Sequence, residues 1–106
     1  MFVKIYHYHI PKDKTEEFMK IQERAGELYS RFVEFETLFL NDTKDETKWL
    51  EISRYKDEDV YRYSMELLDE ETELHTLFKD FKALLTSEVK EEELHEMKKI
   101  TNVNAE

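Results

Sequence analysis

The chain has 106 residues, which is enough for one domain, and 40% of them are hydrophobic while another 40% are charged. The formal net charge of −10 disfavours phosphate backbones and anionic membranes, so we expect neither nucleic acid nor a membrane as partner. Cysteine is absent and glycine occurs once, which excludes disulfides, thiolate metal sites and glycine-rich phosphate loops. No segment has the pattern of a membrane span or a signal peptide, so we expect a cytoplasmic protein.

The first expected element is a strand over residues 2–10. Its side chains alternate between two faces, one with Phe2, Lys4, Tyr6, Tyr8 and Ile10 and the other with Val3, Ile5, His7 and His9. Pro11 ends this strand because proline has no N–H to donate to a neighbouring strand.

An amphipathic helix is expected from Asp13 to Phe32, with Asp13 as its N-cap and Glu16 in the capping-box position. Its apolar stripe consists of Phe18, Ile21, Ala25, Leu28 and Phe32. Gly26 lies inside this helix, where glycine costs about 1 kcal/mol relative to alanine. Two interpretations stay open for Gly26: it permits the close approach of another backbone, or it has no role.

Two further strands are expected, over residues 33–40 and 49–56, separated by a polar turn at 41–47. In the first, Val33, Phe35, Thr37 and Phe39 alternate with Glu34, Glu36, Leu38 and Leu40. In the second, we expect Leu50 and Ile52 to face the helices. The opposite, uncovered face would then carry Trp49, Glu51, Ser53 and Tyr55.

A second helical region begins at Asp57, which is a suitable N-cap. Its expected inner stripe is Val60, Tyr63, Leu67 and Leu68, followed by a break at residues 69–71 and a second N-cap at Thr72. The next helix has the clearest apolar period, formed by Leu74, Leu77, Phe78, Phe81, Leu84 and Leu85. Residues 89–100 fit both helical and strand spacing. We assign a strand there because the element order requires one, and we expect a frayed tail at 101–106.

The order of these elements, βαββαβ, predicts an α+β ferredoxin-like fold: a single domain over residues 1–100 with a four-stranded antiparallel sheet and helices on one face. The other face would expose aromatic and aliphatic side chains to water. We therefore expect a homodimer formed through the sheet face, with roughly 800 Å² buried per partner.

The segment WLEISRYKDEDVY, residues 49–61, resembles the antibiotic biosynthesis monooxygenase (ABM) family of dimeric α+β barrels, and the element order agrees over nearly the whole chain. In cofactor-free members, a strand-end aromatic and a tyrosine six residues later reach the ligand pocket. The matching residues are Tyr55, in place of a tryptophan, and Tyr61. Glu51 stands where those enzymes have an asparagine. The resemblance thus implies Glu51, Tyr55 and Tyr61 as catalytic residues. Trp49 and Ser53 share the strand face of Glu51 and Tyr55, so we expect them to line the same pocket.

The function implied is that of a cofactor-independent monooxygenase acting on a small phenolic or quinonoid molecule. In that role, Glu51 would accept a phenol proton. A non-catalytic dimeric ligand-binding or regulatory module is the alternative, in which the same side chains only pack. Haem-degrading relatives form a third possibility, with a histidine of the last helix as iron ligand. His75 is the histidine on that helix, although it lies about one turn earlier.

The remaining candidates are histidines. His7 and His9 point the same way from one strand and, with Glu51 and His95, have the residue types of a metal site. The alternative, which we favour, is that they are ordinary strand residues. For this reason we expect no metal and no cofactor. We count His7, His9 and His75 among the candidate residues of the ligand pocket.

Overall fold

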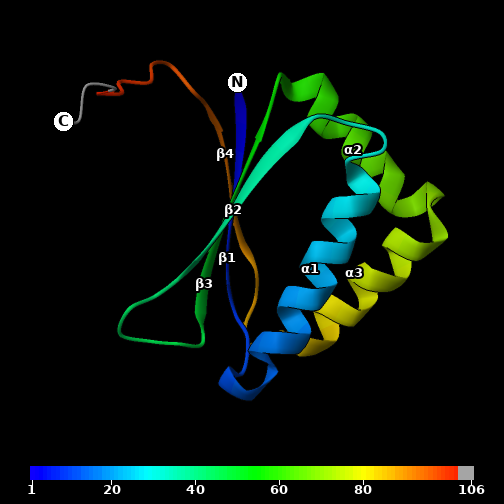
Figure 1. Ribbon diagram of the computed structural model, residues 1–106, viewed down its shortest axis with the longest axis vertical. Helices are drawn as coiled ribbons and strands as arrows, with labels where there is room; N and C mark the ends of the chain where they lie inside the picture. Colours follow the sequence, from blue (N-terminus) through cyan, green and yellow to red (C-terminus); the bar gives the residue numbers. More distant parts are fainter. Residues whose placement is uncertain (103–106) are drawn as a thin grey trace.

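Four antiparallel strands form a single sheet in the order β2-β3-β1-β4, and all the helices lie against one of its faces (Figure 1). The computed structural model describes residues 1–102. The elements are β1 (Phe2–His9), the 3-10 turn η1 (Lys12–Lys14), α1 (Thr15–Tyr29), β2 (Phe35–Asn41), β3 (Lys48–Tyr55), α2 (Glu58–Glu70), α3 (Thr72–Leu84) and β4 (Lys90–His95). This confirms the α+β ferredoxin-like βαββαβ fold. None of the described helices is long and apolar enough to cross a membrane.

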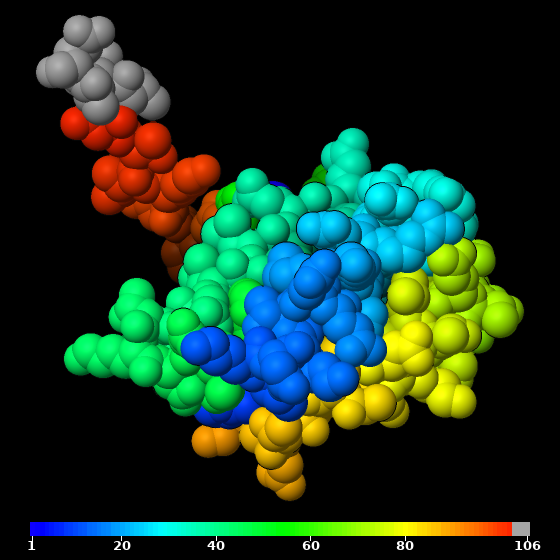
Figure 2. Space-filling view, turned by 60° about the horizontal axis from the view of Figure 1, so that its bottom comes forward, coloured from blue at the N-terminus to red at the C-terminus, as the bar shows by residue number. Residues whose placement is uncertain are grey.

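The last strand is shorter than the expected 89–100 and lies at the edge of the sheet, with every side chain exposed. It pairs with β1, and Lys4 of β1 reinforces that pairing through ion pairs to Glu91 (2.9 Å) and Glu93 (3.0 Å). After Glu96, residues 97–102 leave the body of the molecule (Figures 1 and 2), with Met97 and Ile100 90% and 86% exposed. The expected frayed tail at 101–106 falls mostly outside the described residues.

The orientation expected for β3 is wrong. Trp49, Ser53 and Tyr55 are buried beneath the helices, whereas Leu50 and Ile52 lie on the opposite face. The reason is the strand register, because residues directly opposite in an antiparallel pair share a face. Trp49 is opposite Tyr8, so the aromatic faces of β1 and β3 are buried together. Aromatic rings remove more apolar area from water than aliphatic side chains do, which favours this choice of face.

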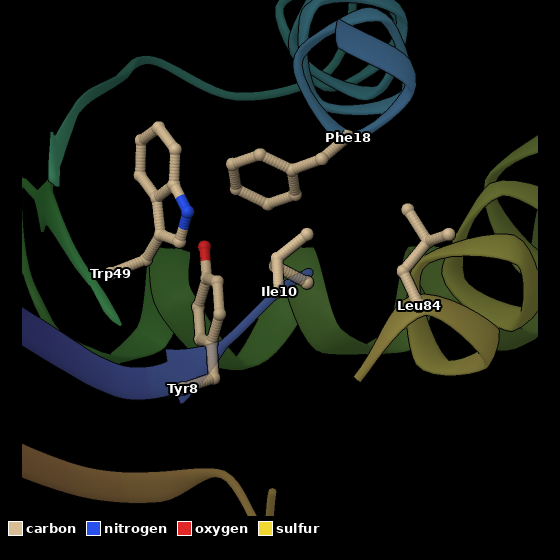
Figure 3. Close-up of a cluster of buried hydrophobic side chains, with 5 residues drawn as sticks. All are labelled: Tyr8, Ile10, Phe18, Trp49 and Leu84. Atoms are coloured by element: carbon tan, nitrogen blue, oxygen red, sulfur yellow. The ribbon is translucent and has the colours of Figure 1, made fainter. Parts of the chain in front are cut away.

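Phe18 of α1 is the centre of the main hydrophobic core and is fully buried. Its ring centroid lies 4.8 Å from that of Trp49 and 5.8 Å from that of Tyr8. Figure 3 shows Phe18 reaching from α1 towards Ile10 and the indole of Trp49. The indole N–H of Trp49 is buried without a hydrogen-bond partner among the described residues, a defect that typically costs about 1–3 kcal/mol.

The start of the first helix differs from the expected capping box. Asp13 lies in η1, and α1 begins at Thr15 without a side-chain cap. The backbone N–H of Lys14 instead donates to the carbonyl of Pro11 at 2.9 Å, which forms a separate turn before the helix. At its other end α1 stops at Tyr29, so Phe32 lies beyond the apolar stripe and is 42% exposed.

The second helical region is capped as expected, because the Asp57 carboxylate accepts a hydrogen bond from the Val60 N–H at 2.9 Å. The break before α3 is also confirmed, although Thr72 is the first residue of α3 and Glu71 occupies the cap position. The buried stripe of α2 differs from the expected one in its tyrosine: Tyr61 is buried, whereas Tyr63 is 42% exposed.

We predict that Phe18→Ala destabilises the protein by about 3–5 kcal/mol, because it removes the ring around which the core is packed. Phe32→Ala makes the same chemical change at an exposed position and should alter the free energy of unfolding by less than about 1 kcal/mol. Urea unfolding followed by Trp49 emission measures both. Equal losses for the two variants would contradict this description of the core.

Candidate functional site

A cavity of about 300 Å³ lies between the helix-covered face of the sheet and helices α1 and α3. Its lining includes aromatic side chains from β1, β2, β3, α1 and α3, and α1 contributes a stretch that includes Gly26. The volume lies at the lower end of the range found for small-molecule sites, which are mostly apolar with a few polar groups. The cavity is therefore on the opposite side of the sheet from the face where sequence patterns placed the pocket.

Glu51 lies on the sheet side of this cavity, near the hydroxyl-bearing residues Thr37 and Ser53. Its Oε1 accepts a hydrogen bond of 2.7 Å from the Tyr8 hydroxyl, and its Oε2 has no hydrogen-bond partner among residues 1–102. Burial raises the pKa of Glu51 to about 7, while the bond from Tyr8 acts in the opposite direction. The carboxyl is thus about half ionised near neutral pH and has one oxygen available to a ligand.

The tyrosines around Glu51 remain protonated. Burial, followed by the charge of Glu51 and the hydrogen bond to it, raises the pKa of Tyr8 well above its usual value. Burial also raises the pKa of Tyr6, Tyr29 and Tyr55, and the nearby Glu51 carboxylate adds to each shift. All four line the cavity as neutral phenols.

Of the three catalytic residues implied by the resemblance, Glu51 and Tyr55 line the cavity and Tyr61 does not. Tyr61 packs behind Tyr55, with ring centroids 5.4 Å apart, and against Phe2 at 5.0 Å. Ser53 also lines the cavity and shares a hydrogen bond of 2.8 Å with the hydroxyl of Thr37. Trp49 lies in the neighbouring core instead.

The histidines are not in the cavity, so their placement in the pocket is wrong. His7 lies on the face of β1 away from Glu51 and bonds Glu92 (2.8 Å), and His9 bonds Thr47 (3.1 Å). His95 lies beside the Phe2 ring, 5.9 Å between centroids. The four residues of the possible metal site are therefore not brought together. No group of three metal-ligating side chains with suitable geometry occurs among the described residues.

His75 is exposed on α3, and no histidine is among the residues that line the cavity. Within residues 1–102, the histidine ligand expected from haem-degrading relatives is therefore not at the cavity.

Sequence reasoning missed Tyr8 and Tyr6. Alternation already placed both on one face with Phe2 and Ile10, so assigning that apolar and aromatic face of β1 to the helices would have found them. It also missed Lys4, which is 4% exposed. Burial lowers the pKa of Lys4, but hydrogen bonds to Glu91 and Glu93 outweigh this and raise it. The ammonium lies 5.5 Å from the ring centroid of Tyr6.

No protein-family model matches the sequence, and no curated protein matches it. Solved structures do match. SnoaB, a cofactor-independent oxygenase from Streptomyces nogalater, superposes with a TM-score of 0.76 at 12% identity, covering 95% of this chain and 97% of that chain. A putative antibiotic biosynthesis monooxygenase from Nitrosomonas europaea gives a TM-score of 0.74 at 18% identity, covering 91% and 89%.

An uncharacterised NIPSNAP domain protein from Burkholderia xenovorans matches as well, with a TM-score of 0.74 at 15% identity and coverage of 96% and 100%. Proteins with different descriptions thus share this architecture at identities that establish the fold and not the activity. The matches confirm the resemblance at that level: this chain has the α+β ferredoxin-like fold of the antibiotic biosynthesis monooxygenase structures.

Proposed function

We propose that the protein is a cofactor-independent monooxygenase that acts on a small phenolic or quinonoid molecule, with Glu51 as the general base. The observation that supports this most directly is a half-buried carboxyl that lines the cavity among aromatic side chains, with one oxygen held by Tyr8 and the other not hydrogen-bonded within residues 1–102. SnoaB, which shares the fold, is described as a cofactor-independent oxygenase.

The raised pKa of Glu51 suits proton transfer from a phenol. A phenol has a pKa near 10, so a carboxylate with the ordinary value of 4.5 would face an uphill transfer of about 7 kcal/mol. With a pKa of about 7 for Glu51, the difference falls to about 4 kcal/mol. The hydrogen bond from Tyr8 holds Oε1 in place, which leaves Oε2 to accept the proton.

The oxidation that follows needs no cofactor, because the substrate supplies the electrons. The phenolate carries negative charge on its para carbon, where a C–O bond to O2 forms and gives a peroxide. Loss of the C–H proton and cleavage of the O–O bond release water and leave a carbonyl. One phenol and one O2 thus give one para-quinone and one water. The apolar walls keep bulk water away from the anion.

The other side chains have supporting roles in this proposal. Tyr55 contacts the substrate ring, and Tyr61 fixes Tyr55 from behind. Ser53, bonded to Thr37, forms part of the polar floor. The non-catalytic module uses the same cavity for binding alone, so the difference between the two functions is turnover.

We also propose that two copies associate through the sheet face opposite the helices, here called the open face. Its apolar side chains are Val3, Ile5, Leu38, Leu40, Leu50, Ile52 and Leu94. Leu38, Leu40 and Leu94 are 51%, 45% and 45% exposed. At the margin, Arg54 pairs with Glu36 (2.7 Å) and Glu96 (2.5 Å). An apolar centre with both charge signs at its rim is self-complementary, as a two-fold contact requires.

A second copy fits this face better than an unrelated partner of opposite charge. Two chains with a net charge of −10 repel each other, so they can meet only where charge is sparse or internally paired. The open face meets that condition, and no described helix covers it (Figure 1).

Glu51→Gln should lower turnover at least about 100-fold, because an amide cannot accept the phenol proton. Oxygen consumption with a panel of phenols and hydroquinones measures this. Glu23→Gln, the same change on the exposed side of α1, should leave the rate unchanged.

Wild-type activity should rise with pH through about 7, as Glu51 loses its proton. Full turnover by Glu51→Gln would refute the assignment of the base, and binding without oxygen uptake by wild type would favour the module.

The same carboxyl predicts an unusual pH dependence of stability. Because the pKa of Glu51 is about 7 in the folded state and 4.5 ordinarily, the folded protein holds this proton more tightly. That stabilisation is complete below about pH 4.5 and is lost as the pH rises through 7. Relative to wild type, Glu51→Gln should therefore gain about 2 kcal/mol between pH 5 and pH 8.

Urea unfolding at the two pH values, at equal protein concentration, measures that gain. Glu23→Gln should differ from wild type by the same amount at both pH values. A Glu51→Gln difference that does not change with pH would show that this carboxyl titrates normally.

Leu38→Lys should convert the dimer to a monomer, because it places a charge in the apolar centre of the open face. Light scattering should give twice the chain mass for wild type and the chain mass for the variant at micromolar concentration. Tyr63→Lys, at an exposed aromatic position on α2, should remain dimeric. Wild-type protein of monomer mass would overturn the proposed association.

A further inference from the structure

Gly26, the single glycine of the chain, lies in the middle of α1, where glycine destabilises a helix relative to alanine. The usual reasons for a glycine are absent. No glycine has a positive φ, and a Cβ added at Gly26 would meet no heavy atom within 4 Å. Neither backbone conformation nor close packing within the described chain accounts for the missing side chain, so the interpretation that another backbone approaches closely here is wrong.

The space beside Gly26 belongs to the cavity. Gly26 is among the residues that line it, together with Gln22 and Tyr29 one turn away on either side of the same helix. Helix α1 forms the wall that faces the sheet, and Glu51 and Ser53 lie on the sheet side. A side chain larger than hydrogen at position 26 would project into this space and reduce the distance available between the helix and the sheet.

We propose that Gly26 is a specificity-determining residue: the absent side chain opens the α1 wall, so that a ligand of two or more fused rings can lie against the helix backbone while its hydroxyl reaches Glu51. This rests on the proposed function of the cavity as a ligand site. A single-ring phenol needs only the part of the cavity near Glu51. The flat surface of a fused-ring ligand also uses the gap left by the missing Cβ, where it makes dispersion contacts with α1.

The test is a comparison of hydroxylated ligands of one and two rings, phenol and 2-naphthol, binding to wild type and to Gly26→Leu. Leucine is a good helix former, so α1 is retained while the wall is filled. Naphthol affinity should fall at least about 10-fold and phenol affinity should change less than about 3-fold, as measured by calorimetry. Glu23→Leu adds the same side chain to an exposed position of α1 and should bind both probes as wild type does.

Gly26→Ala provides a second measurement that does not depend on tolerating a large side chain. It should raise the melting temperature by about 4–8 °C and weaken naphthol binding less than Gly26→Leu does. Naphthol binding that is unchanged in both variants would overturn the role of Gly26 and leave the ligand site intact. If wild type bound neither probe, the ligand site itself would be refuted, and the role of Gly26 with it.

Discussion

The structure depends on which face of the sheet lies under the helices. Tyr8 and Trp49 are directly opposite each other on β1 and β3, and both pack around Phe18 of α1. Once these rings are buried together, alternation fixes the side of every other residue on the two strands. Glu51 then has to point towards the helices, and Leu50 and Ile52 have to point away from them. The candidate site and the open face are thus two consequences of one packing choice.

A carboxyl in this position works against folding. Glu51 lies between Trp49 and Ser53 on the buried face of β3, where ionisation is unfavourable and its pKa rises to about 7. The bond from Tyr8 offsets part of this cost, but the second oxygen stays unpaired within the described residues. A protein built for stability alone would have an apolar side chain here. The combination of a buried carboxyl, an open cavity and a helix glycine therefore argues for a site where a ligand completes the packing.

The glutamates of the edge strand β4 are paired with residues of the neighbouring strand β1. The side chains of β4 are all exposed, and three consecutive glutamates occupy its middle. Lys4 forms ion pairs with two of them, Glu91 and Glu93, from within the sheet, while Glu92 bonds His7 on the other face. Charge on an exposed edge discourages further strand pairing. The proposed association therefore uses the face of the sheet, where apolar side chains gather, and not this edge.

Local patterns were sufficient for the element order, the Asp57 cap, the break before α3 and hence the βαββαβ fold, because periodicity and capping act over a few residues. They also singled out Glu51, Tyr55 and Ser53, which line the cavity, since alternation places these three residues on one face of a single strand. They did not determine that Trp49 and not Leu50 faces the helices, that the histidines lie away from Glu51, or that Gly26 borders a cavity. Those facts depend on register between strands far apart in the chain and on which of two apolar faces buries more area. Only the folded structure shows which face of the sheet the helices cover.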